Sequence, residues 1–237
     1  MAVALPLLSG AALGWLAMRP AVVRSFRPGD LATSHLGALT VPFALFLAFM
    51  VGDIWQRGNQ FAETLLHEVQ RIEAMRDLLW LCGAECVPVT DALRSYARAL
   101  AQHEWQAGWT EPHLAVSTLF DTLSARLAAL KDSAVISDQL RNALVVGQGE
   151  LRRLRTDRYF ILHAELAPYR WTVVFVLGVL SQVGIAALHV GRRPQLIVGL
   201  ATFSLAFAVT LSYTVSLAWP TVDTGIIPAQ ELRRILD

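Results

Sequence analysis

The sequence predicts an all-α integral membrane protein with four transmembrane helices and a helical-bundle soluble domain inserted between the second and the third. Three observations support this fold class. Of the 237 residues, 54% are hydrophobic and only 16% are charged, whereas soluble domains carry about 25% charge. The charges are missing from four long apolar stretches, and a charged segment with helical periodicity separates the second from the third. This composition argues against a soluble enzyme, a nucleic-acid-binding protein and a secreted disulfide scaffold.

The four apolar stretches contain 18, 22, 20 and 24 residues, and they are Met1–Met18, Leu31–Gly52, Trp171–Val190 and Leu196–Trp219. Each is near the roughly 20 residues that a helix needs to cross the hydrocarbon core. In the first stretch the basic residues follow the apolar run, which favours a retained span over a cleaved signal peptide. We therefore expect transmembrane helices 1 and 2 in residues 1–53, helices 3 and 4 in residues 171–219, and a C-terminal tail in residues 220–237.

Residues 54–170 are expected to form the soluble helical bundle, because they carry 13 basic and 14 acidic residues with helical spacing of the apolar ones. In its first helix, apolar residues recur at steps of three and four, which predicts one buried face: Phe61, Leu65, Val69, Ile72, Met75 and Leu79. Only Gly58 lies between this helix and the second span, so the two are expected to form one long rod.

Three further helices are expected in this domain. The segment Cys82–Pro88 is predicted to be a turn, and Thr90-Asp91 is a candidate N-cap for the next helix. A third helix is expected to open at Thr110-Glu111-Pro112, and a fourth at Ser133. Short turns between amphipathic helices predict an antiparallel bundle. Its expected core positions are Leu93, Tyr96, Leu100, Trp105, Val116, Leu119, Leu123, Leu127, Leu130, Leu140, Leu144, Leu151 and Leu154.

The sequence offers no catalytic or metal-binding pattern, so we expect no enzyme, no metal and no cofactor. Its six histidines show no metal-ligand spacing: His35, His67, His103, His113, His163 and His189. Cys82 and Cys86 are four residues apart and lack further ligands at zinc spacing. The two cysteines fit either a pair of free thiols or a local disulfide, and we favour the free thiols.

The second span carries the candidate site. Six residues follow one another at steps of four and three and so share one helix stripe: His35, Leu39, Pro42, Phe46, Phe49 and Asp53. In one interpretation the stripe lines a pore, and the two phenylalanines form a hydrophobic constriction that gates by dewetting. In the other, the aromatic residues pack in a helix bundle and Asp53 pairs with Arg57 four residues on.

The loop charges predict the orientation in the membrane. The short loops Arg19–Asp30 and Gly191–Gln195 are basic and share one side of a four-span chain, which the positive-inside rule makes cytoplasmic. The helical domain is then extracytoplasmic. Of the 20 basic residues, 19 are Arg, and this preference for Arg over Lys points to a GC-rich bacterial genome. We therefore expect a multi-pass protein of the bacterial cytoplasmic (inner) membrane.

Four stretches resemble the bacterial bestrophin-like membrane protein family. They are Leu45-Phe-Leu-Ala-Phe49 with Trp55, Leu93–Leu100 with Glu104-Trp105, the basic run Arg152–Arg155, and the tail segments Pro220–Gly225 and Pro228–Leu232. Together they span nearly the whole chain. The tail departs from the family pattern at Trp219 and in the spacing of Thr221–Ile227, so its binding role in relatives is not carried over.

The resemblance implies a homo-oligomeric channel or pore, pentameric by analogy with bestrophins, with the second span as its lining. Its partners would be the lipid bilayer, further copies of the chain and ions, with no nucleic acid. The resemblance also implies a cytosolic helical domain, which conflicts with the loop charges, and both orientations stay open. The alternative function is a non-conducting membrane sensor or scaffold whose helical domain binds a ligand or partner.

Overall fold

The computed structural model of the chain describes residues 4–25, 33–105, 111–130, 136–163 and 168–218. All regular elements in these ranges are helices, and none of the described residues belongs to a strand. The chain divides into two compact units. Among the described residues, one comprises residues 4–56 and 168–218, and the other comprises residues 57–163. We call the first the membrane unit and the second the helical unit.

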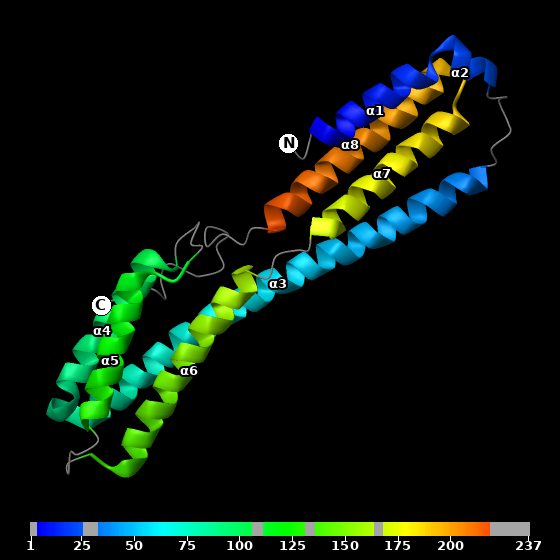
Figure 1. Ribbon diagram of the computed structural model, residues 1–237. Coiled ribbons are helices and arrows are strands. Elements are labelled where there is room, and N and C mark those ends of the chain that lie inside the picture. The colour runs from blue at the N-terminus through cyan, green and yellow to red at the C-terminus, as the bar shows by residue number, and fades with distance from the viewer. Residues whose placement is uncertain (1–3, 26–32, 106–110, 131–135, 164–167, 219–237) are drawn as a thin grey trace. The chain divides into compact units, whose positions relative to one another are not determined.

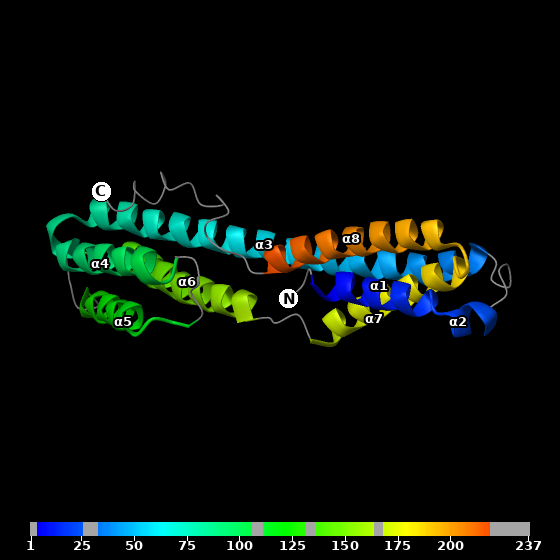
Figure 2. The same cartoon turned by 90° about the horizontal axis from the view of Figure 1, so that it is seen from above.

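The membrane unit contains helices α1 (Ala4–Ala17), α2 (Pro20–Ser25), α7 (Pro168–Leu188) and α8 (Arg193–Ala218), with the first part of α3 (Thr33–Cys82). Helix α1 lies against both α7 and α8, which also contact each other (Figures 1 and 2). Gly191 joins α7 to α8 with φ of 83°, a backbone conformation that a glycine adopts without strain. This tight connection is the predicted short basic loop.

Three helical stretches of the described chain are long and apolar enough to cross a membrane, and they begin at Leu36, Tyr169 and Arg193. They correspond to the predicted second, third and fourth spans. The expectation of a first full span is not confirmed, because α1 has 14 residues and is therefore about 21 Å long. A hydrocarbon core is about 30 Å thick, and the next helix, α2, starts at Pro20 after a break.

A polar junction joins α1 to α7 and α8. The Gln182 side chain is fully buried, accepts a hydrogen bond from Ser9 Oγ at 2.7 Å, and donates to the Pro6 carbonyl and to Ser204 Oγ, both at 2.9 Å. Gly10 lies so close that a Cβ there would be 2.1 Å from Ser204 Oγ. The amide is thus satisfied within the membrane unit, where an unpaired polar group is costly.

The helical unit is built from the last part of α3 with α4 (Val87–His103), α5 (Leu114–Ala129) and α6 (Asp138–His163). The predicted rod is confirmed, since α3 is one helix of 50 residues and Gly58 does not interrupt it. All six predicted core residues of its second half are buried, with exposed fractions of 4% or less. They form one core with residues of α4, α5 and α6.

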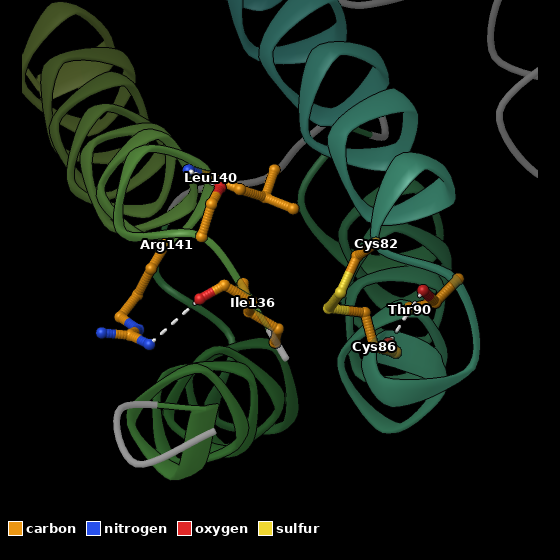
Figure 3. Close-up of a disulfide and its surroundings, with 7 residues drawn as sticks. Cys82, Cys86, Thr90, Ile136, Leu140 and Arg141 are labelled. Carbon is orange, nitrogen blue, oxygen red and sulfur yellow. Dashed lines mark hydrogen bonds between the residues drawn. A yellow bond between two sulfur atoms is a disulfide. The ribbon is translucent and has the colours of Figure 1, made fainter. Parts of the chain in front are cut away.

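Cys82 and Cys86 form a disulfide across the turn between α3 and α4, with a Cα–Cα distance of 5.7 Å (Figure 3). The favoured expectation of free thiols is therefore wrong. The 3-10 turn Gly83–Cys86 brings the two side chains together, and such a turn is tighter than an α-helical one. The sulfur atoms end up beside the core, where Cys86 is fully buried.

Helix α4 begins earlier than predicted, at Val87 rather than after Thr90-Asp91. Pro88 fits the first turn because its missing N–H has no partner there in any helix. Thr90 Oγ donates to the Cys86 carbonyl at 3.0 Å instead of capping the helix (Figure 3). The caps predicted at Thr110 and Ser133 lie outside the described residues.

The following two helices use other caps. His113 Nδ1 accepts a hydrogen bond from the Ala115 N–H at 3.3 Å, at the start of α5. Ser137 Oγ accepts from the Leu140 N–H at 3.3 Å, at the start of α6. Both helices therefore begin several residues later than the sequence predicts.

Candidate functional site

The predicted stripe of α3 runs along the edge of the face that packs within the membrane unit. Phe43 and Met50 lie on that face and are buried, and Phe46 packs partly against the same cluster. Phe49, by contrast, is 74% exposed. Of the remaining stripe residues, Leu39 is half-buried and Pro42 is exposed; His35 belongs to α3, but its side chain is outside the description. The structure thus brings the stripe onto one helix and leaves Pro42 and Phe49 exposed, whereas Leu39 and Phe46 are partly covered.

Asp53 ends the stripe and forms an ion pair with Arg170, near the start of α7. The sequence offered Arg57 as the partner at helical spacing. Each side chain of the observed pair keeps about a third of its surface exposed. The ion pair links α3 to α7, and it puts a basic group beside the Asp53 carboxylate at the end of the stripe.

A buried charge cluster in the helical unit was not predicted as a site. It consists of Glu68 of α3, Glu104 after α4, and Arg155 and Arg158 of α6. Glu68, Glu104 and Arg158 are buried. Isolated buried charges cost several kcal/mol each, so clusters of this kind persist when every charge has a partner.

Glu104 is the centre of the cluster. It accepts hydrogen bonds from Arg155 Nε at 3.0 Å and Nη2 at 2.5 Å, from Arg158 Nη2 at 2.8 Å and from the His113 N–H at 2.9 Å. Burial alone would raise the pKa of this carboxyl, but the bonds from Arg155 and His113 and the charges of Arg155 and Arg158 outweigh it and lower the pKa. Glu104 therefore holds its negative charge at the junction of α4, α5 and α6.

Glu68 has a different environment. One carboxylate oxygen accepts a hydrogen bond from Trp105 Nε1 at 3.0 Å and lies 3.2 Å from Arg158 Nε. The other oxygen has no hydrogen-bond partner among the described residues, and neither has the buried Tyr96 hydroxyl. Burial raises the pKa of the Glu68 carboxyl, and the Arg158 charge offsets only part of that effect.

Two sequence signals were available for this cluster. Glu68 lies between Leu65 and Ile72 at steps of three and four, so it belongs to the buried face of its helix. Arg155 and Arg158 are three apart and share a helix face with Leu151. A charge on a predicted core face indicates a buried pair, although the sequence does not say which charges meet.

The described residues offer no group of three or more His, Cys, Asp or Glu side chains that could hold a metal ion. His103 and His113 stack with parallel rings, their centroids 4.2 Å apart. His113 Nδ1 accepts the cap hydrogen bond from Ala115, so the neutral ring carries its proton on Nε2. The two histidines therefore contribute to the local structure at the start of α5.

The comparisons with known proteins agree with the fold. The Bestrophin-like domain family matches residues 5–223. A crystal structure of a mutant bacterial bestrophin homologue from Klebsiella pneumoniae is similar, with a TM-score of 0.66 and 13% sequence identity, over 100% of this chain and 97% of the other. No curated protein matches in sequence. Since the family match covers nearly the whole chain, the protein belongs to the bestrophin-like family.

Proposed function

We propose that the protein is the subunit of a homo-oligomeric bestrophin-like ion channel or pore, lined by α3 along His35, Leu39, Pro42, Phe46, Phe49 and Asp53. The observation that carries the proposal is the exposure of Phe49 on a spanning helix whose other face is packed. One exposed aromatic ring per subunit, repeated around a symmetry axis, makes an apolar constriction that opposes wetting. The membership of the bestrophin-like family supports the same arrangement.

The test is ion flux through the purified protein in liposomes. Truncation of Phe46 and Phe49 to Ala widens the constriction, so flux should rise above that of the unmodified protein. Phe43→Ala is the matched control, because this ring is on the same helix but is buried against Phe207, with ring centroids 5.2 Å apart. The control should lose a few kcal/mol of stability through cavity formation without a gain in flux. Equal flux from all variants would contradict the proposed lining.

The ion pair at the end of the stripe gives a second test of the same pore. A carboxylate ring at a pore mouth attracts cations and repels anions. Asp53→Asn should therefore shift the selectivity toward anions. Arg170→Gln removes a basic partner of that carboxylate and should shift the selectivity toward cations. Reversal potentials in asymmetric salt measure both changes, and an unchanged selectivity in both conducting variants would remove Asp53 from the pore.

We place the helical unit outside the cytoplasm of the bacterial inner membrane. Two observations support this orientation: the short basic loops favour the cytoplasmic side, and the Cys82–Cys86 disulfide is of a kind that persists in oxidising compartments. After mild reduction of intact cells, an outer-membrane-permeant but inner-membrane-impermeant thiol reagent should label Cys82, which is partly exposed. Labelling of Cys82 only after the inner membrane is opened under non-denaturing conditions would assign the opposite orientation.

The second candidate is a non-conducting membrane sensor or scaffold whose helical unit binds a ligand or partner. It is favoured by a charged cleft between α5 and α6. A well-formed oligomer that carries no flux in any of the variants above, together with a ligand bound in this cleft, would support the sensor and contradict the channel.

A further inference from the structure

A small cleft opens between α5 and α6 in the helical unit, and it encloses about 190 Å³. Three residues of each helix line it: Ser117, Phe120 and Asp121 of α5, and Arg152, Arg155 and Thr156 of α6. A water molecule takes about 30 Å³ in the liquid. The cleft therefore has room for a molecule of a few heavy atoms and not for a drug-sized ligand or a nucleotide.

One wall of the cleft presents hydrogen-bond donors. Arg155 is fixed by its two bonds to the buried Glu104 and by a third to Ser117 Oγ at 3.0 Å, which leaves Nη1 without a hydrogen bond among the described residues. Arg152 lies over the Phe120 ring, 5.2 Å from its centroid. Its guanidinium makes no hydrogen bond or ion pair within the described chain. These donors suit a carboxylate, which guanidinium groups bind through paired hydrogen bonds.

The rest of the cleft presents acceptors. Ser117 donates its hydroxyl proton to the His113 carbonyl at 3.3 Å, and Thr156 donates its own to the Arg152 carbonyl at 2.9 Å. The Thr156 hydroxyl therefore keeps both lone pairs for a ligand, whereas Ser117 Oγ, which already accepts from Arg155 Nη2, keeps one. Asp121 adds a carboxylate that pairs with no described residue, not even with the arginines of the same cleft. An ammonium group donates hydrogen bonds and has no acceptor, which matches this side.

We propose that the cleft binds a small zwitterion with one carboxylate and one ammonium group, as in an amino acid. The carboxylate contacts Arg152 and Arg155, and the ammonium group contacts Asp121 and Thr156. A ligand that is only an anion is repelled by the Asp121 carboxylate and leaves it without a partner. A ligand that is only a cation is repelled by the guanidinium groups of Arg152 and Arg155. Only a ligand with both charges satisfies both sides. Because binding is measured without flux, this proposal does not depend on whether the protein conducts.

The test is isothermal titration calorimetry on the full-length protein in detergent, with four matched probes. L-alanine and β-alanine carry both charges at two spacings. Propionate lacks the ammonium group and ethylamine lacks the carboxylate. At least one zwitterion should bind at least tenfold more tightly than either single-charge probe. Binding of propionate as tight as that of both zwitterions would show a plain anion site, and no binding by either zwitterion up to about 10 mM would also overturn the proposal.

Three exposed substitutions then assign the contacts. Arg152→Gln and Asp121→Asn each remove one charge and should weaken the binding of the zwitterion at least tenfold. Arg153→Gln is the matched control, because its side chain is 81% exposed, pairs with Asp157 on the same helix and does not line the cleft. Circular dichroism checks that all three variants remain folded. Equal affinities for the unmodified protein and all three variants would place the ligand elsewhere and contradict the proposal.

Discussion

At the scale of single residues, Glu104 determines how the buried charge cluster holds together. Glu104→Gln leaves Arg155 and the buried Arg158 without their shared carboxylate. Breaking a buried pair from one side costs about 3–5 kcal/mol, so we expect a loss of that size in the free energy of unfolding near neutral pH. Denaturant titration of the detergent-solubilised protein measures it. Glu111→Gln, at an exposed position, is the control and should have almost no effect.

The two carboxyls of the cluster should respond to pH in opposite directions. The pKa of Glu104 is lowered in the folded protein, so its stabilisation is present above the ordinary value of 4.5 and is lost as the pH falls through the folded pKa. The pKa of Glu68 is raised from the ordinary value of 4.5, so its contribution is present below that value and is lost as the pH rises through the folded pKa.

Melting temperatures measured across pH check these signs. The melting temperature of Glu104→Gln should lie below that of the unmodified protein, and this difference should become smaller at acidic pH. The deficit of Glu68→Gln should instead shrink as the pH rises above 4.5. Parallel curves for the two variants would contradict the assignment of opposite pKa shifts.

At the scale of the helix, the docking of α1 depends on a close approach at Gly10. A Cβ there would meet Ser204 Oγ at 2.1 Å and Ser204 Cβ at 3.1 Å, and overpacking of this kind costs about 1–3 kcal/mol. Gly10→Ala should lower the melting temperature, whereas Gly14→Ala should not, since a Cβ at Gly14 makes an ordinary contact with Leu200 at 3.4 Å. Ser204→Ala should rescue part of the first loss, because it removes the nearest atom; additive losses would contradict this geometry.

The turn between α3 and α4 gives a second prediction at this scale. The oxidised protein should be two hydrogen atoms lighter than the reduced protein and should contain no free thiol, since its only two cysteines are joined. Intact mass spectrometry under non-reducing conditions measures this. Replacement of both cysteines with Ser should reduce stability by about 2 kcal/mol or less, because the disulfide closes only a short loop. Unequal stability of the two single Ser variants would point to roles for the thiols beyond the bond.

At the scale of the whole molecule, the proposed channel requires a symmetric oligomer with Phe49 near its axis. In a variant with Ser at positions 82 and 86, Phe49→Cys should form disulfide-linked dimers on mild oxidation, because equivalent residues of a narrow constriction approach one another. Met50→Cys is the control, since this neighbour is 3% exposed within its own subunit. Gel electrophoresis reports the crosslinks. Crosslinking through position 50 but not 49 would reverse the proposed lining face.

Much of this architecture follows from the sequence alone, for a local physical reason. Apolar residues at helical spacing indicate which side of a helix is buried, and every predicted core residue of α3 from Phe61 to Leu79 is buried. Runs without charge likewise indicate the second, third and fourth spans. The absence of a strong breaker at Gly58 was enough to predict one continuous α3.

Only the tertiary structure decided which distant residues meet. The sequence offered Arg57 to Asp53 at helical spacing, and only the packing of α7 against α3 brings Arg170 to the same carboxylate. No pattern in the sequence joins Glu68 with Arg158, or Glu104 with Arg155, because the partners of each pair lie in segments far apart along the chain. The disulfide required a 3-10 turn that four-residue spacing alone does not impose. Periodicity is a property of neighbours along the chain, whereas charge pairing depends on how separate helices pack in space.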